Sequence, residues 1–338
     1  MIILELREFF LTKTVPLFRP TEIKEDAKSF ISMYGGYMND VAIMAKDSKG
    51  FAYYPSKTAP VYENRPDFLE QFITLASEIG VNVSVGMNLF VDEYFAKDPK
   101  YKTYNENGEA APHAVCPNRV ELIDYAKEIV SELLNFPVSE IILFGAGYIR
   151  DDYCLCKTCK KEFAKAISAD SDISWSLISS DANYMSAWEE FRSSKINNAL
   201  QEIKSVIVSS GKDVKLTVEI PIDPETGLSD GLLKTYGLDI NAIRDITKSI
   251  MINVYPWTPA LPDQGTKEFD ELVSSLYFTK EFIRRGGSVS IYRWGASDED
   301  TINQLRAIAK AAELDRVITS FTLPENYRER RESSLFVL

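Results

Sequence analysis

The chain has 338 residues, of which 45% are hydrophobic and 26% charged, so it can bury a large core and lacks the bias of a disordered or fibrous protein. Its formal net charge of -12 repels phosphate backbones and anionic lipids, and no basic run is long enough to overcome this repulsion locally. We therefore expect neither a nucleic-acid partner nor a membrane partner.

The N-terminal segment MIILELREFF is typical of a strand, over residues 2–7, and not of a secretion signal. Glu5 and Arg7 interrupt its apolar run, and no small-residue cleavage site follows. No apolar run elsewhere approaches transmembrane length. We expect a cytoplasmic protein, and the sequence leaves a homo-oligomer open.

Short apolar runs rich in Ile and Val recur along the chain and alternate with helical patterns, which indicates a parallel sheet. Helices are expected at 66–79, 119–134 and 267–285, and a fourth from Ser297; Asn118, with Glu121 three positions on, is expected to cap the second. The expected strands are 2–7, 41–46, 81–88, 140–147, 214–220, 249–255, 289–294 and 317–322.

Eight such units predict a (β/α)8 TIM barrel that spans residues 1–338 as one domain. A doubly wound open sheet uses the same alternation, but eight units and the lack of a glycine-rich phosphate fingerprint after the first expected strand count against it. One connection is unusually long: residues 150–212 form an expected insertion between the fourth and fifth strands, with a helical pattern near 184–210. Such a segment in a compact domain is usually functional or carries its own structure.

All four cysteines of the chain lie near this insertion, at Cys116, Cys154, Cys156 and Cys159. The last two form a C-x2-C pair that suits tetrahedral thiolate coordination, so we expect a structural zinc site closed by four thiolates. His113, the only histidine, is the alternative ligand to one thiolate, although an exposed loop histidine is the simpler interpretation. Two disulfides or free buried thiols are the other possibilities, and a reducing compartment disfavours disulfides.

The stretch CPN at 116–118, followed by a helix and then CLCKTCKKEF at 154–163, resembles the zinc-binding cysteine pattern of glycoside hydrolase family 42 β-galactosidases. This resemblance implies a TIM-barrel enzyme that acts on glycosides and assigns the zinc to the same four cysteines. The family carries one catalytic glutamate after the fourth strand and another at the end of the seventh. This chain reads LFGAGYIRDD and IYRWGASDED at those places, so the catalytic glutamates do not carry over.

Polar residues at the carboxyl ends of barrel strands are the remaining candidates for chemistry, because TIM-barrel active sites form there. Strand alternation in VKLTVEIP points Lys215, Thr217 and Glu219 into the barrel. Tyr53, Tyr54 and Phe90 are candidates for an aromatic rim. By the same parity, the inward-facing residues expected on other strands are Glu5, Arg7, Asn88, Asn253, Tyr255, Trp257, Tyr292 and Trp294; of these we expect all but Asn253 to contact a carbohydrate, with the aromatic rings as walls for sugar rings.

We expect Glu219 to act as the general acid of a glycoside hydrolase, with Asp151 or Asp152 as the nucleophile or base. A carboxyl separation of about 5 to 5.5 Å predicts retention and one of about 6.5 to 9.5 Å predicts inversion. Simpler interpretations are also open. Glu5 and Arg7 could form an ion pair in the barrel floor, and Asp151 and Asp152 could be solvated loop residues.

A barrel that binds carbohydrate or an effector without catalysis is the alternative function, since the family's glutamates are missing. A metal-dependent hydrolase is disfavoured, because there is one histidine and the expected zinc site is closed.

Overall fold

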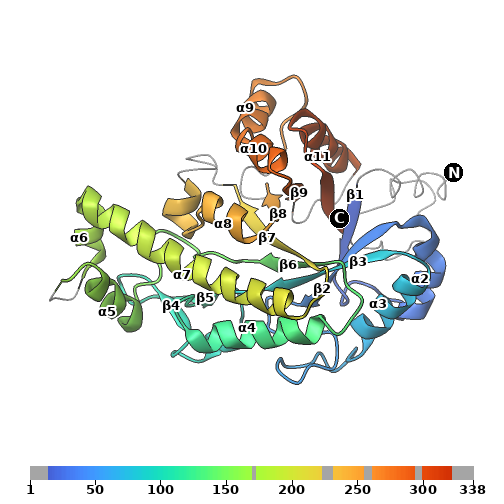
Figure 1. Cartoon of the computed structure of the whole chain (residues 1–338), viewed down its shortest axis with the longest axis horizontal. Coiled ribbons are helices and arrows are strands. Elements are labelled where there is room, and N and C mark those ends of the chain that lie inside the picture. The colour runs from blue at the N-terminus through green and yellow to red at the C-terminus, as the bar shows by residue number, and fades with distance from the viewer. Residues whose placement is uncertain (1–13, 170–172, 223–230, 255–260, 294–298, 322–338) are drawn as a thin grey trace.

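The computed structural model describes residues 14–169, 173–222, 231–254, 261–293 and 299–321, and its centre is a closed barrel of eight parallel strands (Figure 1). The order around the barrel is β1-β10-β9-β8-β7-β6-β3-β2. The expected TIM barrel is thereby confirmed. The barrel strands are β1 (Thr14–Phe18), β2 (Asp40–Lys46), β3 (Asn82–Asn88), β6 (Glu140–Phe144), β7 (Lys215–Pro221), β8 (Ser249–Asn253), β9 (Ser288–Arg293) and β10 (Arg316–Phe321).

Helices surround this barrel, and a two-stranded hairpin of β4 (Lys102–Tyr104) and β5 (Ala110–Val115) lies in the connection that follows β3. The helices are α2 (Ala27–Tyr34), α3 (Phe68–Glu78), α4 (Val120–Leu133), α5 (Lys157–Ala166), α6 (Trp175–Ser180), α7 (Ala182–Ser209), α8 (Ile240–Ile246), α9 (Lys267–Ser275), α10 (Phe278–Arg284) and α11 (Glu299–Ala311). Shorter turns are η1 (Gly35–Tyr37), η2 (Phe95–Lys97) and η3 (Leu232–Tyr236). None of the helices in the described ranges has the length and apolar character needed to cross a bilayer.

The first barrel strand differs from the prediction. It is β1, Thr14–Phe18, which pairs with β10 and β2, whereas the sequence pattern placed it at residues 2–7, outside the described residues. Pro16 explains the miss, because a proline inside a short apolar run removes a ladder donor and argues against a central strand. The remaining seven expected strands overlap β2, β3, β6, β7, β8, β9 and β10.

Two helix predictions also need correction. The expected single helix at 267–285 is two, α9 and α10, separated at Leu276 and Tyr277, whose amides bond to carbonyls three residues back. Asn118 does not cap α4; its side-chain amide instead donates to Glu162 on α5 at 2.9 Å. A contact with a residue distant in sequence, Glu162, has thus replaced the helix cap that the local pattern predicted for Asn118.

The core has an outer and an inner part. Residues 216, 218 and 220 of β7, and residue 214 directly before it, belong to the outer part, between the strands and the helices, as alternation predicts. The barrel interior is filled by a smaller apolar cluster: Val15, Leu17, Ala42, Met44, Ile142, Phe144, Met251, Tyr292 and Ile318. Odd-numbered residues of β7 therefore face the barrel axis, and Glu219 is among them.

A polar layer closes the amino-terminal end of the barrel. Glu140, 2% exposed, forms an ion pair with Arg316 and accepts hydrogen bonds from Ser84 at 2.8 Å and from Thr217. Burial alone would raise the pKa of Glu140, but the Arg316 charge and these hydrogen bonds outweigh it and hold the pKa below its ordinary value. Glu5 and Arg7, the expected floor pair, lie outside the described residues.

The connection between β6 and β7 carries α5, α6 and α7 and extends to one side of the barrel (Figure 1). It has a small core of its own, in which Trp188 stacks on Phe191 and meets Phe163 edge-on. The last helix of the connection is α7, which packs along α4 and leads back to β7. This segment is therefore folded structure and not a long irregular loop.

Candidate active site and metal centre

Glu219 lies at the carboxyl end of β7, inside the barrel, with both carboxylate oxygens held. The Gly145 amide donates to Oε2 at 2.9 Å, and the Asn253 side chain donates to Oε1 at 2.5 Å. Burial raises the pKa of Glu219, and the two hydrogen bonds offset this only in part. The result is a carboxyl group with an elevated pKa at the face where barrel enzymes place their chemistry.

Gly145 supplies the amide because it directly follows β6 and turns the chain there. Its φ is 58°, in the left-handed region that glycine adopts at little cost, and a Cβ atom on it would approach Val91 Cγ2 to 2.7 Å. A side chain is therefore excluded on two grounds. The glycine in the sequence FGAG is the local signal for this close approach.

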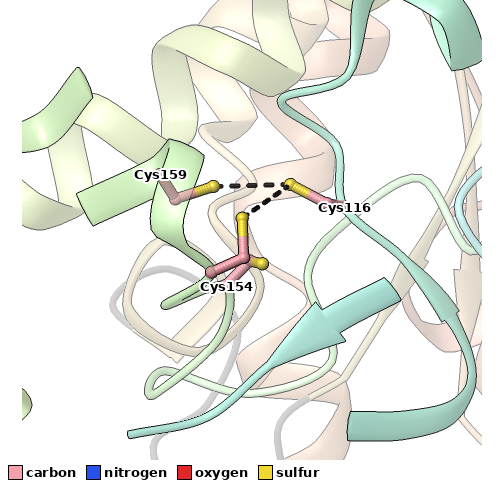
Figure 2. Close-up of side chains that lie close together, drawn as sticks. Cys116, Cys154 and Cys159 are labelled. Atoms are coloured by element: carbon pink, nitrogen blue, oxygen red, sulfur yellow. Dashed lines mark hydrogen bonds between the residues drawn. The ribbon is translucent and has the colours of Figure 1, made fainter. Parts of the chain in front are cut away.

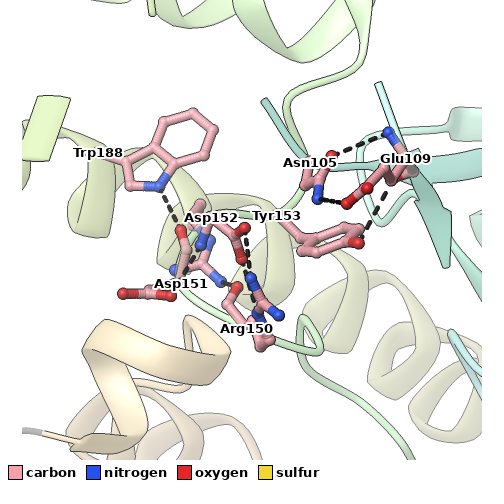
Figure 3. Close-up of polar contacts among 8 residues, drawn as sticks. Asn105, Glu109, Arg150, Asp151, Asp152, Tyr153 and Trp188 are labelled. Atoms are coloured by element: carbon pink, nitrogen blue, oxygen red, sulfur yellow. Dashed lines mark hydrogen bonds and ion pairs between the residues drawn. The ribbon is translucent and has the colours of Figure 1, made fainter. Parts of the chain in front are cut away.

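Asp151 and Asp152 lie on the loop after β6, and their hydrogen bonds and ion pairs join them to Arg150, to Trp188 and to each other (Figure 3). Asp152 forms a two-point ion pair with Arg150, at 2.9 and 2.6 Å. The Asp151 side chain accepts from the Asp152 amide, and its carbonyl accepts from the Trp188 indole at 3.0 Å. The half-buried Asp151 carboxylate thus makes fewer hydrogen bonds than that of Asp152 and has no ion pair with Arg150.

The expected carbohydrate contacts are described only in part. Asn88 ends β3 and is half-buried, and its carbonyl accepts from Lys46 at 3.2 Å. Tyr292 has no exposed surface and packs edge-on against Phe144 inside the barrel, so it fills the interior beneath the site and offers no open sugar platform. Glu5, Arg7, Tyr255, Trp257 and Trp294 lie outside the described residues.

The expected aromatic rim of Tyr53, Tyr54 and Phe90 is wrong. All three are at most 2% exposed and belong to the outer core. The Tyr54 hydroxyl donates to Glu132 of α4 at 3.0 Å, and the Tyr53 hydroxyl donates to Asp47 at 2.8 Å. These rings hold the connection after β2 onto the helices and have no surface left for a ligand.

The four cysteines converge on one point (Figure 2). Cys116 follows the β5 strand, Cys154 and Cys156 lie on the loop after β6, and Cys159 is in the first turn of α5. All four are buried and free of disulfides, and their sulfurs lie within 4.8 Å of one another. Hydrogen bonds, led by the one from Cys116, lower the pKa of the Cys156 thiol.

This geometry fits a tetrahedral metal. Zinc–sulfur bonds of about 2.3 Å place neighbouring sulfurs about 3.8 Å apart in a tetrahedron. The Sγ atom of Cys116 lies 3.9 Å from that of Cys156 and 3.4 Å from that of Cys159. His113 is not part of the cluster; its side chain is 60% exposed and its Nδ1 lies 3.4 Å from Glu93. The four thiols are thus compatible with a structural metal held by Cys116, Cys154, Cys156 and Cys159.

Comparison with known proteins gives a fold and no sequence family. No family model and no curated protein sequence matches the chain. The fold is that of solved glycoside hydrolases. The glycoside hydrolase domain of PgaB (BpsB) from Bordetella bronchiseptica matches with a TM-score of 0.69 and 11% identity, over 94% of this chain and 95% of that one.

Two larger enzymes show the same barrel. The α-L-fucosidase isoenzyme 2 from Paenibacillus thiaminolyticus has a TM-score of 0.60 and 20% identity, over 91% of this chain and 45% of its own. The family 42 β-galactosidase Gan42B from G. stearothermophilus has a TM-score of 0.62 and 10% identity, over 90% of this chain and 50% of its own. This chain spans about half the length of each. At such identities the likeness shows the fold alone.

Two groups next to the cysteine cluster were not predicted from the sequence. Arg192 of α7 is completely buried and lies over the ring of Tyr148, 4.4 Å from its centroid. Arginine is a residue type that is almost never fully buried, and Tyr148 follows β6 among loop residues, so neither carries a local signal of burial. Their contact joins positions far apart in the chain, which sequence patterns do not reveal.

Proposed function

We propose that the protein is a glycoside hydrolase whose general acid is Glu219. The observation that carries this proposal is the buried Glu219 carboxyl, held by Gly145 and Asn253 at the carboxyl end of a barrel strand with its pKa raised. An acid catalyst must stay protonated at working pH, and a raised pKa serves that requirement. The likeness to solved glycoside hydrolase barrels supports a carbohydrate as the substrate class.

The second carboxylate in this proposal is Asp151, with Asp152 as the alternative. Both follow the fourth barrel strand, which neighbours the strand that carries Glu219. Asp151 is favoured because the carboxylate of Asp152 is neutralised by Arg150. A pair flanking a glycosidic bond then protonates the leaving oxygen from one side and attacks or activates water on the other.

Glu219→Gln should lower hydrolysis of aryl or oligosaccharide glycosides by about 10²- to 10⁴-fold, the range for loss of a general acid. The fold should survive, because a glutamine oxygen can still accept from Gly145 and the Asn253 amide can turn to accept from the new NH2 group. The measurement is initial rate on a panel of nitrophenyl glycosides and β-linked oligosaccharides, with Asp151→Asn and Asp152→Asn beside it.

Glu78→Gln, an exposed carboxylate at the end of α3, is the control and should retain full activity. The pH profile adds a second readout: activity should persist above the ordinary carboxyl range and fall as Glu219 loses its proton. A parent protein that binds oligosaccharides but hydrolyses none, with Glu219→Gln binding equally well, would support the non-catalytic carbohydrate- or effector-binding barrel instead.

We further propose that the metal held by the four cysteines is zinc, and that it fixes the segment 150–212 beside the active face without taking part in the chemistry. Four protein ligands leave no coordination position for water or substrate. The cysteine spacing also supports kinship with family 42 enzymes, although the catalytic glutamates of that family are absent from this chain. A single domain over 1–338 and a cytoplasmic location remain predictions from the sequence.

A further inference from the structure

The two oxygens of the Glu219 carboxyl group contact donors of different kinds. Oε2 accepts from the backbone amide of Gly145 at 2.9 Å, and Oε1 accepts from the side-chain amide of Asn253 at 2.5 Å. A backbone N–H donates and never accepts, whereas a primary amide carries both a donor and an acceptor. Since a protonated carboxyl oxygen is a poor acceptor, the Gly145 contact favours Oε2 as the oxygen without a proton. The proton of the acid form therefore belongs on Oε1, beside Asn253.

Both donors are fixed by the strand ends that carry them. The carbonyl of Gly145 accepts from the amide of Phe90, at 3.1 Å, in addition to the contact that its own amide makes with Glu219. Asn253 ends β8 in register with Pro221 of β7, and its carbonyl accepts from the amide of Ile222 at 3.0 Å. The main chain thus places the Asn253 side chain against the carboxyl group.

The pair of Glu219 and Asn253 lies above the apolar filling of the barrel. Both residues are half-buried, whereas Met251, which is in register with Glu219, and Tyr292, which is in register with Asn253, have no exposed surface. Phe144 closes the same interior layer. A substrate can therefore approach the carboxyl group from the open face of the barrel, while hydrocarbon and aromatic side chains seal it from below.

Hydrogen bonds govern the proton affinity of Glu219 together with its burial. Burial raises the pKa of Glu219, and the Gly145 and Asn253 hydrogen bonds lower it, in that order of size. Within the described residues no charge from the neighbouring strand ends adds to these influences; the charged or titratable groups there are Arg150, Asp151, Asp152, Tyr292 and Arg293. Because the Gly145 donor belongs to the main chain, the Asn253 donor is the one that a substitution can remove.

We propose that Oε1 of Glu219 carries the transferable proton, and that Asn253 is the positioning residue that stabilises the carboxylate formed when this proton leaves. The inference rests on the function proposed above. In that step the proton passes from Oε1 to the glycosidic oxygen, the bond from this oxygen to the sugar carbon breaks, and its electron pair stays on the departing oxygen. The second carboxylate or water then supplies the new bond to the sugar carbon. The Asn253 contact strengthens as Oε1 becomes anionic, since charge-assisted hydrogen bonds are the stronger ones.

The direct test is the pKa of Glu219, followed by the carboxyl ¹³C resonance of the full chain labelled with ¹³C-glutamate. Glu219→Gln identifies the resonance by its disappearance. Asn253→Leu removes the donor at similar volume and should raise the pKa by about one pH unit or more, the equivalent of a hydrogen bond to a charged group. Asn253→Asp keeps the shape but adds a carboxyl group. Its last proton should leave at a still higher pH, because two adjacent carboxyl groups share one proton.

Asn82→Leu is the matched control. Asn82 is exposed at the amino end of β3, and its side-chain amide also donates to a carboxylate, that of Asp40, at 3.1 Å. The variant therefore loses the same kind of contact at the opposite end of the barrel. It should leave both the pKa of Glu219 and the hydrolysis rate unchanged.

The pH profile of hydrolysis separates a positioning role from a structural one. Activity falls as pH rises through the pKa of Glu219, so this fall should move to higher pH in Asn253→Leu by the amount that the resonance shows. The plateau value of kcat should drop by about tenfold or more, with little change in KM, because Asn253 acts through Glu219.

An unchanged pKa in Asn253→Leu, or lost activity without a displaced profile, would overturn the inference. A raised pKa in Asn253→Leu, in a parent protein that hydrolyses no glycoside, would support the control of the Glu219 proton by Asn253 and remove the glycosidase function alone. Should Asn253→Leu fail to fold, the same comparisons on Asn253→Asp decide.

Discussion

Arg316→Met should destabilise the protein by about 3–5 kcal/mol, the usual effect of removing one partner from a buried ion pair. The carboxylate of Glu140 is 2% exposed, and Arg316 approaches both of its oxygens. Ser84 and Thr217 would still donate to Glu140, but its ion-pair partner would be gone, and only the weaker influence of the exposed Lys215 charge would remain. Chemical denaturation at pH 7 measures the free energy of unfolding directly.

The difference between parent and variant should depend on pH. In the parent the pKa of Glu140 is lowered, so the stability it contributes is present above the unfolded value of about 4.3 and is lost as pH falls through the folded value. Without Arg316, burial raises the pKa, and stability is lost as pH rises instead. The difference in the free energy of unfolding between the parent and Arg316→Met should therefore be largest near neutral pH and should become smaller below about pH 4.

A double variant, Glu140→Leu with Arg316→Met, is the control for this prediction. Replacing both charges by apolar side chains removes the unpaired carboxylate and should recover most of the lost free energy. Equal destabilisation of the single and double variants would mean that the arginine acts through packing and not through its charge.

Cys156→Ser should abolish stoichiometric metal binding and loosen residues 150–170 while the barrel stays folded. The thiolate ligand is lost, and the three remaining sulfurs no longer close the site. The inner core of the barrel contains neither the four cysteines, which belong to the outer core, nor any residue of the small α5–α7 cluster. Amide exchange within 150–170 should quicken by at least about tenfold, equal to about 1.4 kcal/mol of local stability.

Metal content by elemental analysis and amide exchange by mass spectrometry check this result. Thr158→Ser, a conservative change in the same turn of α5, should keep both the metal and the slow exchange. Chelation of the parent protein should reproduce the exchange pattern of Cys156→Ser. A parent chain purified without metal, or a serine variant that exchanges like the parent, contradicts the proposed role.

The sequence predicted the parts of this molecule that obey local periodicity. Alternation along VKLTVEIP predicted that Glu219 faces the inside of the barrel, and the cysteine spacing predicted that the four thiols lie together, as they do in the structure. It failed where a local rule was overridden. Pro16 made the first barrel strand look unlike a strand, and Asn118 donates to Glu162 on α5 instead of capping α4. The Glu140–Arg316 and Arg192–Tyr148 pairs join residues distant in sequence, and no local pattern announces them.

The segment from Gly145 to Cys154 is fastened at both ends, by the hydrogen bond to Glu219 and by the cysteine cluster. A change of length within it would displace a catalytic candidate and a metal ligand together. The connection between β3 and α4 reaches the same cluster, because it contributes Cys116, and its first amides donate to the carbonyls of Phe144 and Gly145. Evolution or engineering that seeks a new substrate range on this scaffold therefore has to keep the length of the stretch after the fourth strand unchanged.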